Sequence, residues 1–124
     1  MTEVVRRHGV QVWTAPAEGP ELATEQDALD TIAGVYRLDA ELLVIPVERF
    51  APRFFDMDSR LIGGFFSKLV AYQYRLAVLG DVSAYVAESP VLRDVVRESN
   101  RGRHVWFVAD QAELDERLAG APGR

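Results

Sequence analysis

Three runs of consecutive apolar residues, at 42–45, 76–79 and 105–108, interrupt the more polar remainder of the chain. Because these runs are continuous rather than alternating, they predict strands that are covered on both faces of a sheet. Segment 3–14 shows a further strand pattern, broken at His8-Gly9 by a dipeptide suited to a tight turn. We expect this segment to form a β-hairpin that supplies a mixed edge to the sheet.

Apolar residues at helical spacing follow the hairpin and each of the three runs. Thr24 with Asp27 marks the start of the first predicted helix, and Ser89-Pro90 marks the start of the third. The second, from about Asp58 to Tyr74, carries two adjacent apolar rows and is expected to be nearly all buried. The predicted helices cover residues 24–36, 58–74, 89–100 and 110–118.

These elements give the order β-β-α-β-α-β-α-β-α. Each connection between the later strands is long enough to contain a helix, so those strands are expected to run parallel. The predicted fold class is α/β, with a mixed, mainly parallel five-stranded sheet flanked by helices. We expect one domain over residues 1–119 and a flexible C-terminal tail at 120–124.

Composition narrows the classes of function. The 124 residues carry a formal charge of −5 and a pI near 5.0, which argues against a nucleic-acid-binding surface. Cysteine is absent and the two histidines are far apart in sequence, so no metal site or cofactor is expected. No apolar stretch has the length of a signal peptide or a membrane span, and we therefore expect a cytoplasmic protein without membrane contact.

The start of the second predicted helix is the first candidate site. Asp58-Ser59 offers a helix cap and a hydroxyl beside exposed backbone N–H groups, so Ser59 is a candidate phosphate acceptor or anion ligand. Arg60 is placed to pair with a bound anion. The alternative is that Asp58 is simply the cap and that Ser59 is an ordinary first-turn residue.

A second set of candidates lies at or after the ends of the strands, where ligands bind in open α/β sheets. Asp56, Asp81 and Ser83 belong to this candidate binding rim, with Tyr85 and Tyr72 as further polar groups. Aspartates gathered on one rim suit cation binding or acid–base chemistry. Loop aspartates are more often turn and cap residues, and no metal-ligand spacing favours the first reading.

Residues 54–108 resemble the bacterial family catalogued as domain of unknown function 4180. The resemblance rests on Phe54-Phe55-Asp56, the 61–72 helix, segment 76–85 and Glu98-Ser99-Asn100-Arg101-Gly102. The element order is also similar to STAS domains, the fold of bacterial anti-sigma-factor antagonists. In STAS domains a partner kinase phosphorylates an Asp-Ser or Asp-Thr motif at the start of the second helix, and Asp58-Ser59 stands in the equivalent place.

Two hypotheses of function follow. The first is a STAS-like regulatory or protein-interaction domain that acts through the loop before the second helix, with another protein or a second copy of the chain as its partner. The alternative is a small-molecule-binding protein, or a small cofactor-independent enzyme, with a pocket between that helix and the carboxyl ends of the strands. The sequence identifies no catalytic residue, because no nucleophile and base pair can be recognised in it.

Overall fold

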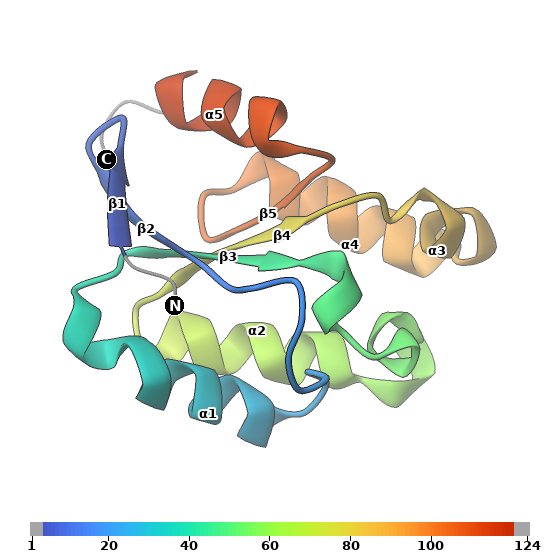
Figure 1. The fold of residues 1–124 in the computed structure, drawn as a ribbon. Coiled ribbons are helices and arrows are strands. Elements are labelled where there is room, and N and C mark those ends of the chain that lie inside the picture. The colour runs from blue at the N-terminus through green and yellow to red at the C-terminus, as the bar shows by residue number, and fades with distance from the viewer. Residues whose placement is uncertain (1–3, 121–124) are drawn as a thin grey trace.

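The computed structural model describes residues 4–120 and shows five strands in one sheet, ordered as in the sequence (Figure 1). They are β1 (Val4–Arg7), β2 (Val10–Thr14), β3 (Leu42–Pro46), β4 (Arg75–Leu79) and β5 (Val105–Val108). β1 pairs antiparallel with β2, and each later strand pairs parallel with the one before it. The predicted mixed, mainly parallel sheet flanked by helices is therefore confirmed.

Helices fill the connections between the parallel strands and follow the last of them. They are α1 (Glu25–Val35), α2 (Leu61–Ala71), α3 (Ser83–Glu88), α4 (Pro90–Arg101) and α5 (Gln111–Gly120). The short helix α3 is absent from the predicted element order. It forms a separate element because Ser89 is extended ahead of Pro90, whose ring disfavours a helical conformation in the residue before it.

Two hydrophobic layers cover the two faces of the sheet. Successive side chains of a strand point to opposite faces. Leu43 and Leu76 accordingly pack in the layer that contains residues of α1, α2 and α4, whereas Leu42 and Ala77 pack against α5. Figure 1 shows α1 and α2 below the sheet and α5 above it. The continuous apolar runs are explained by this two-sided burial.

A cluster of stacked and edge-on aromatic rings forms the part of the core next to α2. Phe50 stacks on Phe54 with ring centroids 4.4 Å apart, and Phe65 of α2 meets both rings edge-on. Phe54 and Phe65 are completely buried, and Phe55 is almost so. Such rings are large buried surfaces with preferred mutual geometry, so they fix the segment after β3 against the helix.

The predicted start of α1 is confirmed. The Thr24 side chain accepts a hydrogen bond from the backbone N–H of Asp27, and the Asp27 carboxylate accepts from the N–H groups of Ala23 and Thr24. This reciprocal arrangement is a capping box. Burial raises the pKa of Asp27, but the hydrogen bonds that its carboxylate accepts outweigh burial and hold the pKa below the usual value.

The segment 98–102, one of those that carry the family resemblance, forms the last turn and the C-cap of α4, just before the edge strand β5. The Asn100 side-chain oxygen accepts a hydrogen bond from the backbone N–H of Phe107 at 2.8 Å, and the Asn100 carbonyl accepts one from Arg117 at 3.1 Å. The indole N–H of Trp106 donates to the carbonyl of Gly102. Asn100 therefore satisfies a backbone donor on the open edge of the sheet.

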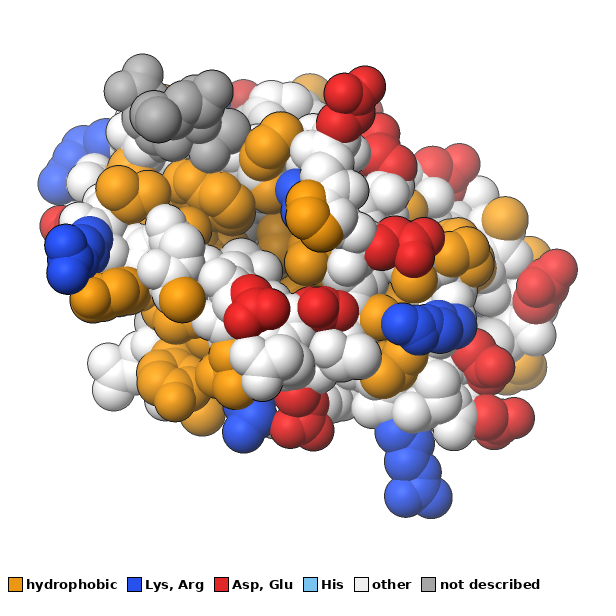
Figure 2. All heavy atoms as spheres, turned by 60° about the horizontal axis from the view of Figure 1, so that its bottom comes forward, with side chains coloured by type: hydrophobic (Ala, Val, Ile, Leu, Met, Phe, Trp, Pro, Cys, Tyr) orange, Lys and Arg blue, Asp and Glu red, His pale blue; other side chains and the backbone are white. Residues whose placement is uncertain are grey.

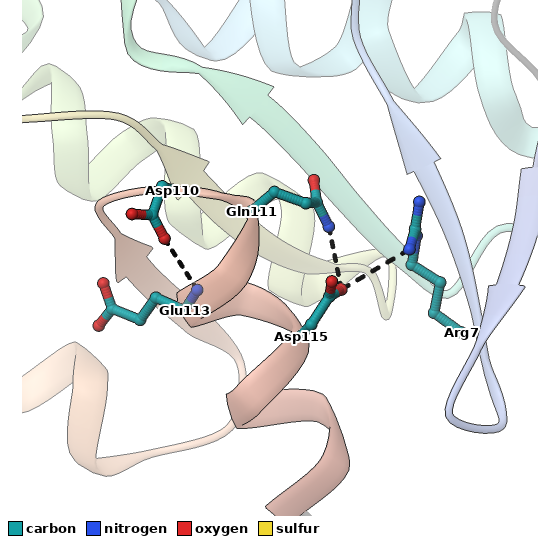
Figure 3. A network of polar contacts seen from close by, with 5 residues as sticks. All are labelled: Arg7, Asp110, Gln111, Glu113 and Asp115. Carbon is teal, nitrogen blue, oxygen red and sulfur yellow. Dashed lines mark hydrogen bonds and ion pairs between the residues drawn. The ribbon is translucent and has the colours of Figure 1, made fainter.

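α5 closes the second face and is tied to the opposite edge strand. Arg7 of β1 forms an ion pair with Asp115 at 3.7 Å, and Asp115 also accepts a hydrogen bond from Gln111 (Figure 3). At the start of the helix the Asp110 side chain accepts a hydrogen bond from the N–H of Glu113, and the Glu113 carboxylate accepts one from the N–H of Ala109. The helix continues to Gly120, the first residue of the predicted tail, and the rest of that tail lies outside the described residues.

No helix within residues 4–120 has the length and apolar character needed to cross a membrane.

We predict that Asn100→Ala lowers the free energy of unfolding by about 1–3 kcal/mol, because it leaves the Phe107 N–H without an acceptor in a partly buried position. Asn100→Asp keeps an oxygen at that place, so its loss of unfolding free energy should be less than half of the loss in the alanine variant. Urea unfolding followed by circular dichroism measures both. Equal losses in the two variants would contradict a role for the side-chain oxygen.

Candidate functional site

An open groove of about 630 Å³ lies beyond the carboxyl ends of β3 and β4. One wall is built from the turns that follow β3, and the other from α3 and the start of α4, which Figure 1 shows at the same end of the sheet. Ligands of open α/β sheets commonly bind at this end of the strands. The lining residues are Pro52, Arg53, Phe55, Asp56, Met57, Asp58, Tyr85, Glu88, Ser89 and Val91.

The first wall consists of two short 3₁₀ turns, Pro52–Phe55 and Met57–Ser59. The Asp56 side chain accepts a hydrogen bond from the N–H of Asp58 at 3.0 Å, which initiates the second turn. Arg60 then adopts a left-handed conformation, with φ of 60°. The prediction that α2 starts at Asp58 with Asp58 as its cap is therefore wrong, because local side-chain bonding and the left-handed residue delay the α-helix to Leu61.

Ser59 has a structural role in this wall. Its hydroxyl lies 2.6 Å from the carbonyl oxygen of Asp56 and 3.0 Å from that of Arg53, and it accepts from the N–H of Leu61 at 3.2 Å. The hydroxyl thus joins both turns to the first residue of α2. Ser59 is nevertheless exposed, and it lies next to the groove without lining it.

The second wall presents Tyr85 of α3 toward the first. The Tyr85 ring stacks on Phe55, with centroids 4.4 Å apart and planes 21° from parallel. Phe55 is almost completely buried, so the pair forms a firm apolar floor that continues from the core into the groove. An amphipathic Tyr ring in such a place offers an apolar face and a polar tip to a ligand.

The remaining candidates of the predicted rim are distributed elsewhere. Asp81 and Ser83 line a smaller hollow of about 240 Å³ between the ends of β4 and β5. The hydroxyl and N–H of Ser83 bond the Asp81 carboxylate and hold its pKa below the usual value. Tyr72 lies at the opposite end of α2, because a helix that connects parallel strands runs back toward their starts.

The charged side chains of the groove are mostly acidic. Asp58 projects from the first wall and Glu88 from the second, with Asp56 also on the first and Arg53 as the positive charge. Within residues 4–120, the carboxylates of Asp58 and Glu88 and the guanidinium of Arg53 form no hydrogen bond or ion pair. The two carboxylates are therefore available to a bound molecule without breaking an internal contact, whereas the positive charge of Arg53 also helps to lower the pKa of Asp27.

The groups that line the groove are suited to non-covalent recognition of a ligand. The groove combines carboxylate acceptors, one guanidinium and an apolar floor. Ser89, the serine in its lining, accepts a hydrogen bond from the N–H of Leu92 at 3.1 Å as the cap of α4. In the described part of the chain, no group of three or more His, Cys, Asp or Glu side chains is arranged to hold a metal ion.

Asp56, Asp58 and Tyr85, which line the groove, are among the candidates predicted from the sequence, whereas Arg53 and Glu88 are not. Arg53 precedes the Phe54-Phe55-Asp56 motif, and Glu88 precedes the Ser89-Pro90 helix start. A signal was present for α3, since Val82, Tyr85 and Val86 have helical i, i+3, i+4 spacing. Six residues are too few for such a pattern to predict a helix with any strength.

Comparison with known proteins gives a match to a family model. The model of a family described as Domain of unknown function (DUF4180) matches residues 7–118. No curated protein and no solved structure matches this chain.

We predict that Ser59→Ala lowers the free energy of unfolding by about 1 kcal/mol, because it removes the hydroxyl that joins the two turns to α2. The matched control is Ser67→Ala on the exposed side of α2, where the serine hydroxyl forms no hydrogen bond among the described residues. That variant should be neutral or slightly more stable, because Ala favours a helix. Chemical denaturation of both variants measures the difference, and equal stabilities would contradict the structural role of Ser59.

Proposed function

Because the chain belongs to the family described as Domain of unknown function (DUF4180), whose description leaves the activity open, we propose its function from the groove itself. We propose a regulatory protein-interaction domain that binds a short segment of a partner protein in this groove. The partner segment carries a basic side chain next to an apolar one. The loop before α2 supplies one wall of the groove and is the part through which binding is regulated.

The observation that carries this proposal is the pair of unpartnered carboxylates on facing walls above an apolar floor. Asp58 and Glu88 attract a cation between the walls, while the Phe55–Tyr85 stack accepts an apolar side chain. Complementary charge speeds association and selects the partner, and the apolar contact contributes most of the affinity. The open shape of the groove admits an extended chain segment without a conformational change.

Regulation through the loop follows from the bonding of Ser59. A phosphate on its oxygen would remove the hydroxyl proton donated to the carbonyl oxygens of the first wall. It would also add negative charge beside Asp56 and Asp58. Phosphorylation of Ser59 would therefore loosen the wall rather than create a stable anion site, and the geometry of the groove would change with it. A STAS-like phosphoswitch at Ser59 would thus act by changing the shape of the groove.

A second candidate function uses the same groove for a small molecule. Its volume of about 630 Å³ falls within the range typical of small-molecule sites, roughly 300–1,000 Å³. The Phe55–Tyr85 stack would hold an apolar or aromatic body, and Asp58 with Glu88 would hold an amine or another cationic group. The shared chemistry of both candidates is a cation attached to an apolar group.

We predict that selection of a random peptide library against the protein enriches sequences with Lys or Arg beside an apolar residue. Titration with a selected peptide should move the amide NMR signals of residues 52–58 and 85–91. Asp58→Lys and Glu88→Lys should each weaken binding by about 10-fold or more, since each replaces attraction by repulsion. Binding should also weaken with added salt.

The matched control is Glu116→Lys, the same change of charge at an exposed position on α5, on the other face of the sheet. It should leave the affinity within about 2-fold, as expected for a distant screened charge. Failure to enrich any such peptide, together with a thermal shift from small cationic metabolites that Asp58→Lys abolishes, would favour the second candidate. Peptides that bind all three variants equally would sink the proposed groove site.

A further inference from the structure

Exposed hydrophobic side chains gather at the end of the molecule opposite the groove. Six large hydrophobic residues of the described chain are exposed, and four of them belong to the final turns of α1 and α2 and the residues just after: Tyr36, Leu38, Val70 and Tyr72. The tyrosines are 59% and 56% exposed, respectively. A local concentration of exposed Tyr, Leu and Val side chains is characteristic of a protein interface.

The sheet register brings these residues side by side. β3 and β4 are parallel neighbours, and Leu42 at the start of one pairs with Arg75 at the start of the other. Leu38 lies four residues before Leu42, and Tyr72 lies three residues before Arg75. The segments that follow the two helices therefore reach neighbouring strands at the same end of the sheet. Figure 1 shows both helices ending at the left, and Figure 2 shows hydrophobic side chains at the same left end, with basic and acidic side chains among them.

A hollow of about 420 Å³ adjoins this exposed patch. It lies at the starts of β4 and β5 and is lined by Glu41, Val70, Gln73, Tyr74, Arg75, Arg103 and His104. The Arg75 guanidinium is held in place by the carbonyl of Arg103 at 2.7 Å and by the ring of Trp106. The Arg103 side chain has no hydrogen bond or ion pair within residues 4–120.

The turn at residues 36–39 is a protruding counterpart to this hollow. Tyr36 and Leu38 are exposed on it, and Asp39 ends it in a left-handed conformation with φ of 60°. Like Arg103, the Asp39 carboxylate has no partner among the described residues. The turn leads into β3, and the hollow extends to the starts of β4 and β5, with Glu41 and the end of α2 at its near side.

We propose that this end of the molecule is the interface of a homodimer with two-fold symmetry. The axis passes close to Val70 and Tyr72, and the 36–39 turn of each copy packs into the hollow of the other. Asp39 of each copy pairs with Arg103 of its partner. A protrusion and a hollow displaced to opposite sides of one axis meet twice in such a dimer, as an isologous interface requires.

The distribution of charge around the patch favours a second copy of the chain over an unrelated partner. The patch carries both signs within a short distance: Arg37 and Arg103 are basic, while Asp39 and Glu41 are acidic. A surface of mixed sign is complementary to itself, whereas a surface for a strongly charged partner has predominantly one sign. The dimer also leaves the groove accessible, because the groove lies at the opposite end of the strands.

The test is sedimentation equilibrium of the full chain over a range of concentrations. The wild type should show a monomer–dimer equilibrium in the micromolar range. Asp39→Lys and Arg103→Glu should each weaken the dimer by about 10-fold or more, and the double variant should regain most of the lost affinity, since it restores opposite charges. Asp39→Asn should weaken the dimer less than Asp39→Lys while preserving the left-handed turn.

Arg93→Glu on the exposed side of α4 is the matched control, and it should leave the dimer unchanged within about 2-fold. Circular dichroism establishes that each variant is folded. A monomeric wild type at about 500 µM, well above the affinity expected of a specific dimer, would overturn the proposal. So would folded single variants that dimerise like the wild type, or a double reversal no better than the single ones. None of these outcomes depends on whether the groove binds a peptide.

Discussion

Burial of Phe50, Phe54 and Phe55 is the interaction on which the candidate site depends. The chain leaves β3 after Pro46 and must return to the start of β4 through α2. The three rings pack together and fix the first part of this path in the core, where Phe50 and Phe54 meet Phe65 of the helix. With the rings fixed, the backbone between them and α2 can only form tight turns on the surface. Those turns are the first wall of the groove.

The same constraint separates structural polar groups from available ones. Within the turns, the side chains of Asp56 and Ser59 satisfy backbone donors and acceptors that no regular helix would satisfy. Asp58 is left over because its side chain points away from these bonds and lines the groove. The motif Asp56 to Arg60 therefore contains both the supports of the wall and one carboxylate that lines the groove without an internal partner. A residue's place in a conspicuous motif does not say which of the two it is.

The sheet was predictable from sequence because strands that are buried on both faces need apolar residues at consecutive positions, as at 42–45. The start of α1 was also predictable, because Thr24 and Asp27 have the residue types and the spacing of a capping box. The start of α2 was not predictable, because helix propensity does not show whether the backbone N–H of Asp58 will bond to the Asp56 side chain or join a further helical turn. The groove could not be predicted from sequence for another reason. Its walls come from segments about 30 residues apart, and only the packing of Tyr85 on Phe55 brings them together.

Parallel topology then gives the molecule two unlike ends. Every connection between the parallel strands β2 to β5 leaves the sheet at the carboxyl ends of the strands and returns at their amino ends, so the turns after these strands share one end and the turns before them share the opposite one. At the first end, insertion of α3 between β4 and α4 adds a wall and turns a row of loops into an acidic groove. At the second end, the helices stop with exposed tyrosines beside unpaired Arg103. Because α2 spans the distance between the two ends, a dimer at one end would present two grooves facing away from the axis, each free to take its own partner segment.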